Sequence, residues 1–143
     1  MNETIERFGY PDTAIREWEH WILLLRPAQP TLGSCILAAK SEATAFGDLP
    51  AAAHAELATV TAEVERALGS FTAYGKINYL MLMMKDPHVH FHVIPRYEGT
   101  IERAGIAVED AGWPGPPALD QAPKLSPEAV TELRDRLSAA FVR

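Results

Sequence analysis

Short apolar runs separated by turn residues mark the first part of the chain. Two such runs, Trp21–Leu25 and Ser34–Ala39, flank a turn over residues 28–33 that contains proline and glycine. Runs of this length between turn residues are typical of buried β-strands. The mixed segment 13–20 predicts an edge strand before them, and the polar residues 1–13 predict a loose N-terminal arm.

The middle of the chain changes to helical spacing and then returns to strand patterns. Over residues 51–71 the apolar side chains recur every three or four positions, which predicts one long amphipathic helix. The run at 76–85 predicts a central strand covered on both faces. A tight turn at Asp86-Pro87 and strong alternation over residues 88–97 predict an antiparallel partner strand.

The last part of the chain has a long segment without periodicity and then a helix. Residues 98–125 are rich in proline and glycine and predict a long loop, which Trp113 is expected to anchor. Residues 126–142 predict a C-terminal helix that starts at Ser126-Pro127. Together the elements predict a single α+β domain over residues 1–143, with a mostly antiparallel sheet.

Composition narrows the possible functions. The 143 residues carry a net charge of −6, which argues against nucleic-acid binding because that relies on many cationic contacts. No apolar run approaches the roughly 20 residues of a membrane span, and the N-terminus lacks a secretory signal pattern. Cys35 is the only cysteine, so no internal disulfide is possible. These features predict a cytoplasmic protein.

The most informative pattern is a strict alternation of histidine and apolar residues over residues 88–93. Its histidines are His88, His90 and His92, and its apolar members are Val89, Phe91 and Val93. Successive side chains of a strand point to opposite faces, so the histidines share one face and the apolar residues share the core face. Neighbouring histidines would then lie about 6.5–7 Å apart at Cα, close enough for two rings to act on one substrate group.

Three interpretations of this face are open. It can be a solvated polar face, although other polar residues would serve that purpose equally well. It can bind a metal through imidazole nitrogen, but three ligands along one strand converge poorly on one ion. It can act in nucleophilic catalysis, with His90 attacking phosphorus and its neighbours stabilising the phosphoryl oxygens.

The segment from His88 to Ile94 resembles the histidine-triad signature at all seven of its positions. The strand–turn–strand before it and the long helix also resemble that superfamily in order. The resemblance covers about residues 21–97 and implies a five-stranded antiparallel sheet, a homodimer and a nucleotide substrate. It implies that His90 is the nucleophile of a hydrolase or nucleotidyl transferase, assisted by His88 and His92, with no metal and no cofactor.

The sequence departs from the family pattern in two places, and both concern substrate binding. Ser34 follows Gly33 where many members have a fourth histidine, and only Lys85-Asp86-Pro87 stands where many have a glycine-rich loop. Ser34 and Lys85 are therefore the candidate substrate-binding residues in those places. The departures keep two alternatives open: a nucleotide-binding module with little turnover, and a metal-binding domain that uses the three histidines.

Overall fold

A computed structural model describes residues 1–141 of the chain. Three α-helices, a short 3-10 helix and seven strands follow one another along it. They are α1 Glu3–Arg7, β1 Ala14–Glu17, β2 Trp21–Leu25, β3 Cys35–Ala39, η1 Phe46–Asp48, α2 Ala51–Thr72, β4 Lys76–Leu80, β5 His90–Arg96, β6 Thr100–Arg103, β7 Ile106–Glu109 and α3 Pro127–Ala140. None of the helices within residues 1–141 has the length and apolar character that crossing a membrane requires.

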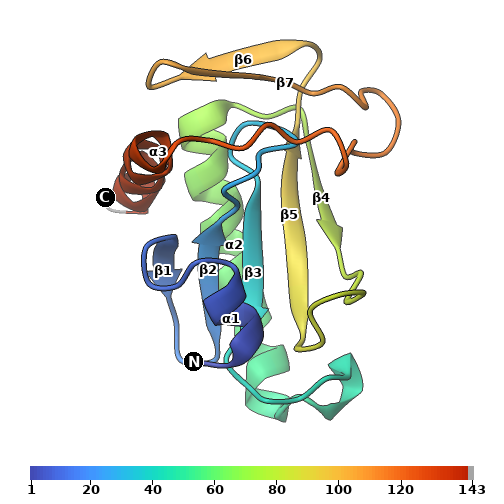
Figure 1. Cartoon of the computed structure of the whole chain (residues 1–143). Coiled ribbons are helices and arrows are strands. Elements are labelled where there is room, and N and C mark those ends of the chain that lie inside the picture. Colours follow the sequence, from blue (N-terminus) through green and yellow to red (C-terminus); the bar gives the residue numbers. More distant parts are fainter. Residues whose placement is uncertain (142–143) are drawn as a thin grey trace.

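The main sheet has five strands in the order β1-β2-β3-β5-β4, and every neighbouring pair is antiparallel. Strands β2 and β3 are buried along their whole length, as the two apolar runs predict. Strand β5, which carries the histidines, lies between β3 and β4 (Figure 1). The predicted α+β fold with a five-stranded antiparallel sheet, one long helix and a C-terminal helix is confirmed.

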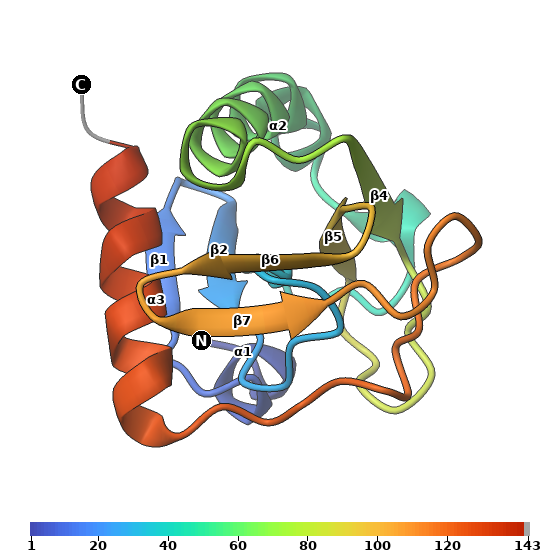
Figure 2. The same cartoon turned by 90° about the horizontal axis from the view of Figure 1, so that it is seen from above.

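The sheet separates two hydrophobic clusters, one on each face. Helix α2 covers one face, and the indole N–H of Trp21 ties it to the sheet by donating to the Ala53 carbonyl at 2.8 Å. Helix α1 lies on the opposite face, as the view from above shows (Figure 2). The cluster beneath α1 is Ile5, Ile22, Leu24, Ile36 and Ala38. The same strands therefore supply both cores, because alternate side chains point to opposite faces.

The first residues of the chain are not a loose arm. Asn2 caps α1, since its side-chain oxygen accepts from the Ile5 amide, and its side-chain nitrogen donates to the carbonyls of Ala39 and Ser41. Ile5 is completely buried. The prediction of a loose arm was wrong because it weighed the polar composition of residues 1–13 and missed the contribution of one capped apolar turn.

The strand after α2 is shorter than predicted and lies at the edge of the sheet. Strand β4 ends at Leu80 and pairs only with β5 within residues 1–141, so it is not central. Its side chains are exposed or half-buried, so it is not covered on both faces. Beyond it, Met83 has a left-handed backbone (φ 50°) and Met84 is 87% exposed. The apolar run therefore leaves the sheet halfway, and its second half forms a loop before β5.

The predicted long loop of residues 98–125 contains a hairpin. Strands β6 and β7 pair from Thr100 with Glu109 to Arg103 with Ile106, across a turn at residues 104–105. These strands alternate weakly in hydrophobicity, so the sequence pattern did not indicate them. The predicted C-terminal helix is present as α3, capped by Ser126, and residue 142 of that prediction lies outside the described residues.

Candidate active site

Two of the three histidines lie side by side on the face that α1 covers. His90 is paired with Ala38 and His92 with Ile36, both members of the cluster beneath α1. The two imidazole rings are 5.3 Å apart between centroids. The ring of Phe8, at the end of α1, lies 5.4 Å from His90 and 6.2 Å from His92. The N-terminal segment thus forms one wall of the histidine site, which the sequence analysis did not foresee.

The hydrogen bond of His90 determines which ring nitrogen can react. Its Nδ1 lies 2.8 Å from the main-chain carbonyl of His88. A carbonyl oxygen only accepts hydrogen bonds, so Nδ1 carries the proton and donates. In the neutral ring the lone pair is then on Nε2. Backbone geometry therefore presents His90 in the tautomer that a nucleophile requires.

The side chain of His88 does not join the other two. It precedes β5, and its Nδ1 lies 2.9 Å from the Thr4 hydroxyl while its Nε2 lies 3.3 Å from a carboxylate oxygen of Glu42. Its main-chain N–H also donates to Thr4 Oγ1 at 3.3 Å. His88 thus acts on His90 through its carbonyl. Its ring contacts Thr4 of α1 and Glu42, whereas the rings of His90 and His92 pack against each other.

His92 occupies a poorly solvated position. Burial, followed by the nearby Arg26 and His90, lowers its pKa to about 4, against a smaller opposing effect of Asp86. His92 is therefore neutral at pH 7. Its Nδ1 is buried and finds no hydrogen-bond partner within residues 1–141. A neutral imidazole there can exchange one hydrogen bond with a ligand but does not supply a permanent charge.

A pocket of about 420 Å³ opens next to His90 and His92. Apolar side chains form part of its wall, and these are Phe8, Leu82, Met83, Met84 and Leu119. They come from α1, from the loop after β4 and from the segment before α3. A mostly apolar wall beside a few polar groups is typical of a small-molecule site. The second half of the apolar run 76–85 thus lines the pocket, which it could not do as part of a central strand.

Charged side chains complete the pocket, and only Lys85 among them was predicted as a site residue. Lys85, Asp86 and Asp120 line it together with Arg26. Arg26 follows β2 and its Nη1 is buried without a partner within residues 1–141. One signal in the sequence was available: Arg26 is two positions after Leu24, so strand alternation puts it on the histidine face. Lys85 lies at the site as predicted, although it is exposed.

Ser34 lies in the turn between β2 and β3 and does not line this pocket. It is completely buried, and its hydroxyl donates to the Thr31 carbonyl at 2.8 Å and lies 2.9 Å from the Thr31 hydroxyl. The side chain of Gln29 holds the same turn by accepting from the Gly33 amide. Ser34 therefore stabilises the turn, and the structure does not support its predicted role in substrate binding. Hydrogen bonds to its own turn already use the hydroxyl.

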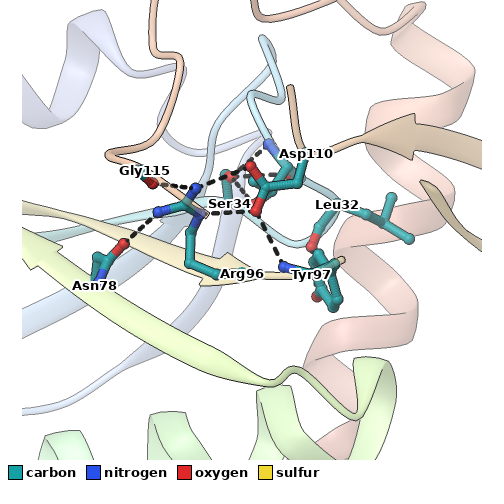
Figure 3. A network of polar contacts seen from close by, with 8 residues as sticks. Leu32, Ser34, Asn78, Arg96, Tyr97, Asp110 and Gly115 are labelled. Atoms are coloured by element: carbon teal, nitrogen blue, oxygen red, sulfur yellow. Dashed lines mark hydrogen bonds and ion pairs between the residues drawn. The ribbon is translucent and has the colours of Figure 1, made fainter. Parts of the chain in front are cut away.

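The opposite end of β5 holds a second polar cluster, centred on Arg96 (Figure 3). Its Nε and Nη2 donate to the two carboxylate oxygens of Asp110 at 2.7 and 3.0 Å. Nη1 donates to Asn78 and Nη2 also donates to the carbonyl of Gly115. The Arg96 guanidinium lies 6.0 Å from the ring centroid of Trp113, which confirms that Trp113 anchors this segment. Arg96 is thus neither solvated nor free for a ligand.

The metal-binding alternative finds no support in the geometry. Within residues 1–141 no group of three histidine, cysteine or acidic side chains is placed to hold a metal ion. The divergence of His88 toward Thr4 and Glu42 explains why the three histidines do not form such a group.

Comparisons with known proteins agree with this geometry. A family profile described as "HIT domain" matches residues 10–99. No curated protein sequence matched the chain. Among solved structures, a histidine triad protein from Sinorhizobium meliloti is 24% identical with a TM-score of 0.73, covering 96% of this chain and 93% of that one.

Two further solved structures have the same fold. A histidine triad protein from Bradyrhizobium japonicum is 22% identical (TM-score 0.71), with 96% of this chain and 93% of that chain covered. A hypothetical histidine triad nucleotide-binding protein from Sulfolobus tokodaii is 17% identical (TM-score 0.69), with 96% and 89% covered. The fold around the pocket is therefore shared with these proteins.

Proposed function

Because the chain belongs to the HIT domain family, we propose that it binds a nucleotide at this pocket and cleaves the bond to its α-phosphorus. The substrate is a phosphoramidate or a dinucleoside polyphosphate, and the products include a nucleoside monophosphate. The observation that carries the proposal is the bond from His90 Nδ1 to the His88 carbonyl, which leaves the Nε2 lone pair for attack.

The first step transfers the nucleotidyl group to His90. The Nε2 lone pair forms a bond to phosphorus, and the bond from phosphorus to the leaving oxygen or nitrogen breaks. The leaving group departs with that electron pair and takes a proton from water. Neutral His92 faces the same space and interacts with the phosphoryl oxygens by hydrogen bonding. The apolar wall of Phe8 and Leu82 suits the nucleobase.

The second step returns His90 to its starting state. A water molecule attacks phosphorus, the bond from phosphorus to Nε2 breaks, and the electron pair returns to Nε2. The proton lost by the water passes to solvent. The hydrogen bond from Nδ1 to the His88 carbonyl is present in both steps and keeps the ring in one orientation.

A hydrolysis assay tests the proposal directly. The panel contains an adenosine phosphoramidate and two dinucleoside polyphosphates, each with and without a chelator. We expect His90→Ala to lower kcat/KM by at least about 10³-fold because it removes the nucleophile. His20→Gln, at the turn between β1 and β2, is the matched control and should keep wild-type turnover. Near-native rates in His90→Ala would overturn the nucleophile assignment.

A binding module with little turnover is the second candidate function. It is favoured by the two departures from the family pattern, Ser34 in place of the fourth histidine and the short connection through Lys85. It predicts that the wild-type protein binds a nucleoside monophosphate while no member of the panel is hydrolysed. The same experiment therefore separates the two functions.

The assembly is also a proposal. Strand β4 is an edge strand, and its outer side is unpaired within residues 1–141, so a second copy can add its own edge there. The homodimer implied by the resemblance is tested by sedimentation of the wild-type protein, in which a monomer would contradict it. The cytoplasmic location stays a prediction.

A further inference from the structure

We propose that Arg26 is a substrate-specificity residue that binds the phosphoryl oxygens of the nucleotide. This inference rests on the proposed function, since it concerns the ligand of the same pocket. Arg26 has no role in the resemblance that identified the histidines. It is singled out by three observations: its position in the sheet, its buried donor without a partner, and its lower exposure than Lys85, the other cation of the pocket.

The register of the sheet places Arg26 on the histidine face. Leu24 is level with Ile36, and Ile36 is level with His92, so these three side chains share one face. Arg26 is the next residue on that face of the same chain segment, and its amide donates to the Ser34 carbonyl at 3.1 Å. Arg26 is thus two residues beyond the level of His92 and two strands away, and its long side chain extends toward the pocket that His92 also lines. It lines the pocket beside both histidines.

The guanidinium of Arg26 lacks the partners that a buried cation requires. Nη1 has no accessible surface and no hydrogen-bond acceptor within residues 1–141. The two carboxylates of the pocket do not pair with it: Asp86 accepts from Arg7 at 3.2 Å, and Asp120 forms no ion pair among the described residues. Burial also lowers the pKa of Arg26, although arginine still remains charged. Arg26 as a whole is half-buried, but a guanidinium nitrogen shielded from water without an acceptor is costly, so the position favours an anion.

The proposed function makes that anion a phosphoryl group, and Arg26 is the less exposed of the two cations that line the pocket. His92 is neutral at pH 7 because burial and Arg26 itself lower its pKa. Lys85 is exposed, where solvent weakens its attraction for an anion. Arg26 is therefore the pocket cation that is better shielded from solvent, and it has the largest charge effect on His92. Its planar fork matches two phosphoryl oxygens, and it supplies the contact that the shortened connection at residues 85–87 cannot make.

Binding measurements test this role without requiring turnover. Calorimetry is carried out with AMP, adenosine and inorganic phosphate on the wild-type protein and on Arg26→Gln and Arg26→Lys. We expect Arg26→Gln to weaken AMP and phosphate binding by at least about tenfold and to leave adenosine binding unchanged. The affinity of Arg26→Lys for AMP and phosphate should lie between those of the wild type and Arg26→Gln, because lysine keeps the charge but lacks the planar guanidinium. Arg16→Gln, which removes an exposed arginine from β1, should bind all three ligands like the wild type.

Thermal unfolding without ligand separates this role from a structural one. Arg26→Gln should melt at or above the wild-type temperature, because it removes a half-buried charge whose Nη1 lacks a partner. An equal loss of AMP and adenosine binding, or a lower melting temperature without ligand, would overturn the proposal. So would wild-type affinity for AMP in Arg26→Gln. If phosphate binds through Arg26 but AMP binds no better than phosphate, the role of Arg26 stands and the nucleotide part of the proposed function fails.

Discussion

Arg26 follows a strand of the main sheet and Arg96 ends another, but the two differ in their hydrogen-bond partners. Arg96 donates to both carboxylate oxygens of Asp110, to Asn78 and to Gly115. Arg26 has a buried nitrogen with no acceptor among the described residues. The difference suggests how to distinguish a buried arginine that stabilises the fold from one that can bind a ligand. A saturated buried cation holds chain segments together, whereas an unsaturated one is available for a ligand.

The largest effect on stability is expected at Arg96, whose guanidinium has protein acceptors on all sides. Asp110→Ala leaves the Arg96 charge buried without its carboxylate and should lower the free energy of unfolding by about 3–5 kcal/mol. Urea unfolding measures this change. Glu109→Ala, at the exposed neighbouring position, is the control and should be nearly neutral. If the two variants lose similar stability, Arg96 is not the cross-link that the geometry indicates, and the contrast with Arg26 disappears.

A smaller change in stability is expected when the pH is lowered, because of His92 in the pocket. His92 has a pKa of about 4 in the folded protein, below its ordinary value of 6.5, so the unfolded chain takes up this proton first. The contribution of His92 to stability is therefore complete above pH 6.5 and is lost as pH falls toward 4. Allowing for its partial exposure, the loss is roughly 1–3 kcal/mol.

Comparison with His92→Gln isolates this contribution, because glutamine does not titrate. Urea unfolding at pH 7, 5.5 and 4.5 should show a shallower loss of stability in the variant than in the wild type. Parallel curves would mean that His92 is solvated in the folded protein. The pocket would then be more accessible to water than the unpartnered nitrogens of His92 and Arg26 indicate.

The smallest effect is expected where α1 meets the histidines. Thr4→Val keeps the shape of the side chain but removes the hydroxyl that contacts His88 Nδ1 and accepts from its N–H. We expect a loss of about 1 kcal/mol in the free energy of unfolding. Thr59→Val on the exposed face of α2 is the matched control. An unchanged stability in Thr4→Val would show that His88 is held by its other contacts.

Much of the fold follows from local patterns. The compact runs at β2 and β3, the helical spacing of α2 and the capped start of α3 are each determined by residues close in sequence. The same holds for His90 and His92, because strand alternation alone places them on one face. Pairing of β5 with β4 also follows, since the connection between them is short.

Other features depend on contacts between distant residues, which a pattern does not contain. Whether β4 is central or at the edge depends on what lies beyond it, and an apolar run is compatible with both. The position of His88 depends on Thr4, 84 residues earlier in the chain. Arg26 was overlooked because a cation at the end of a strand is usually solvated. Only the three-dimensional arrangement shows that it is half-buried and lines the same pocket as His92.

The brevity of α1 has a consequence for motion. A helix of five residues is far too short to persist by itself, so it is helical only while it is docked on the sheet. Docking is fixed by Ile5, by the Asn2 bonds and by Thr4, and so the segment can detach as one local opening event while the five strands stay folded. Each opening removes the Phe8 wall from His90. The accessibility of the histidines is thus coupled to a local folding equilibrium at the chain's first residues.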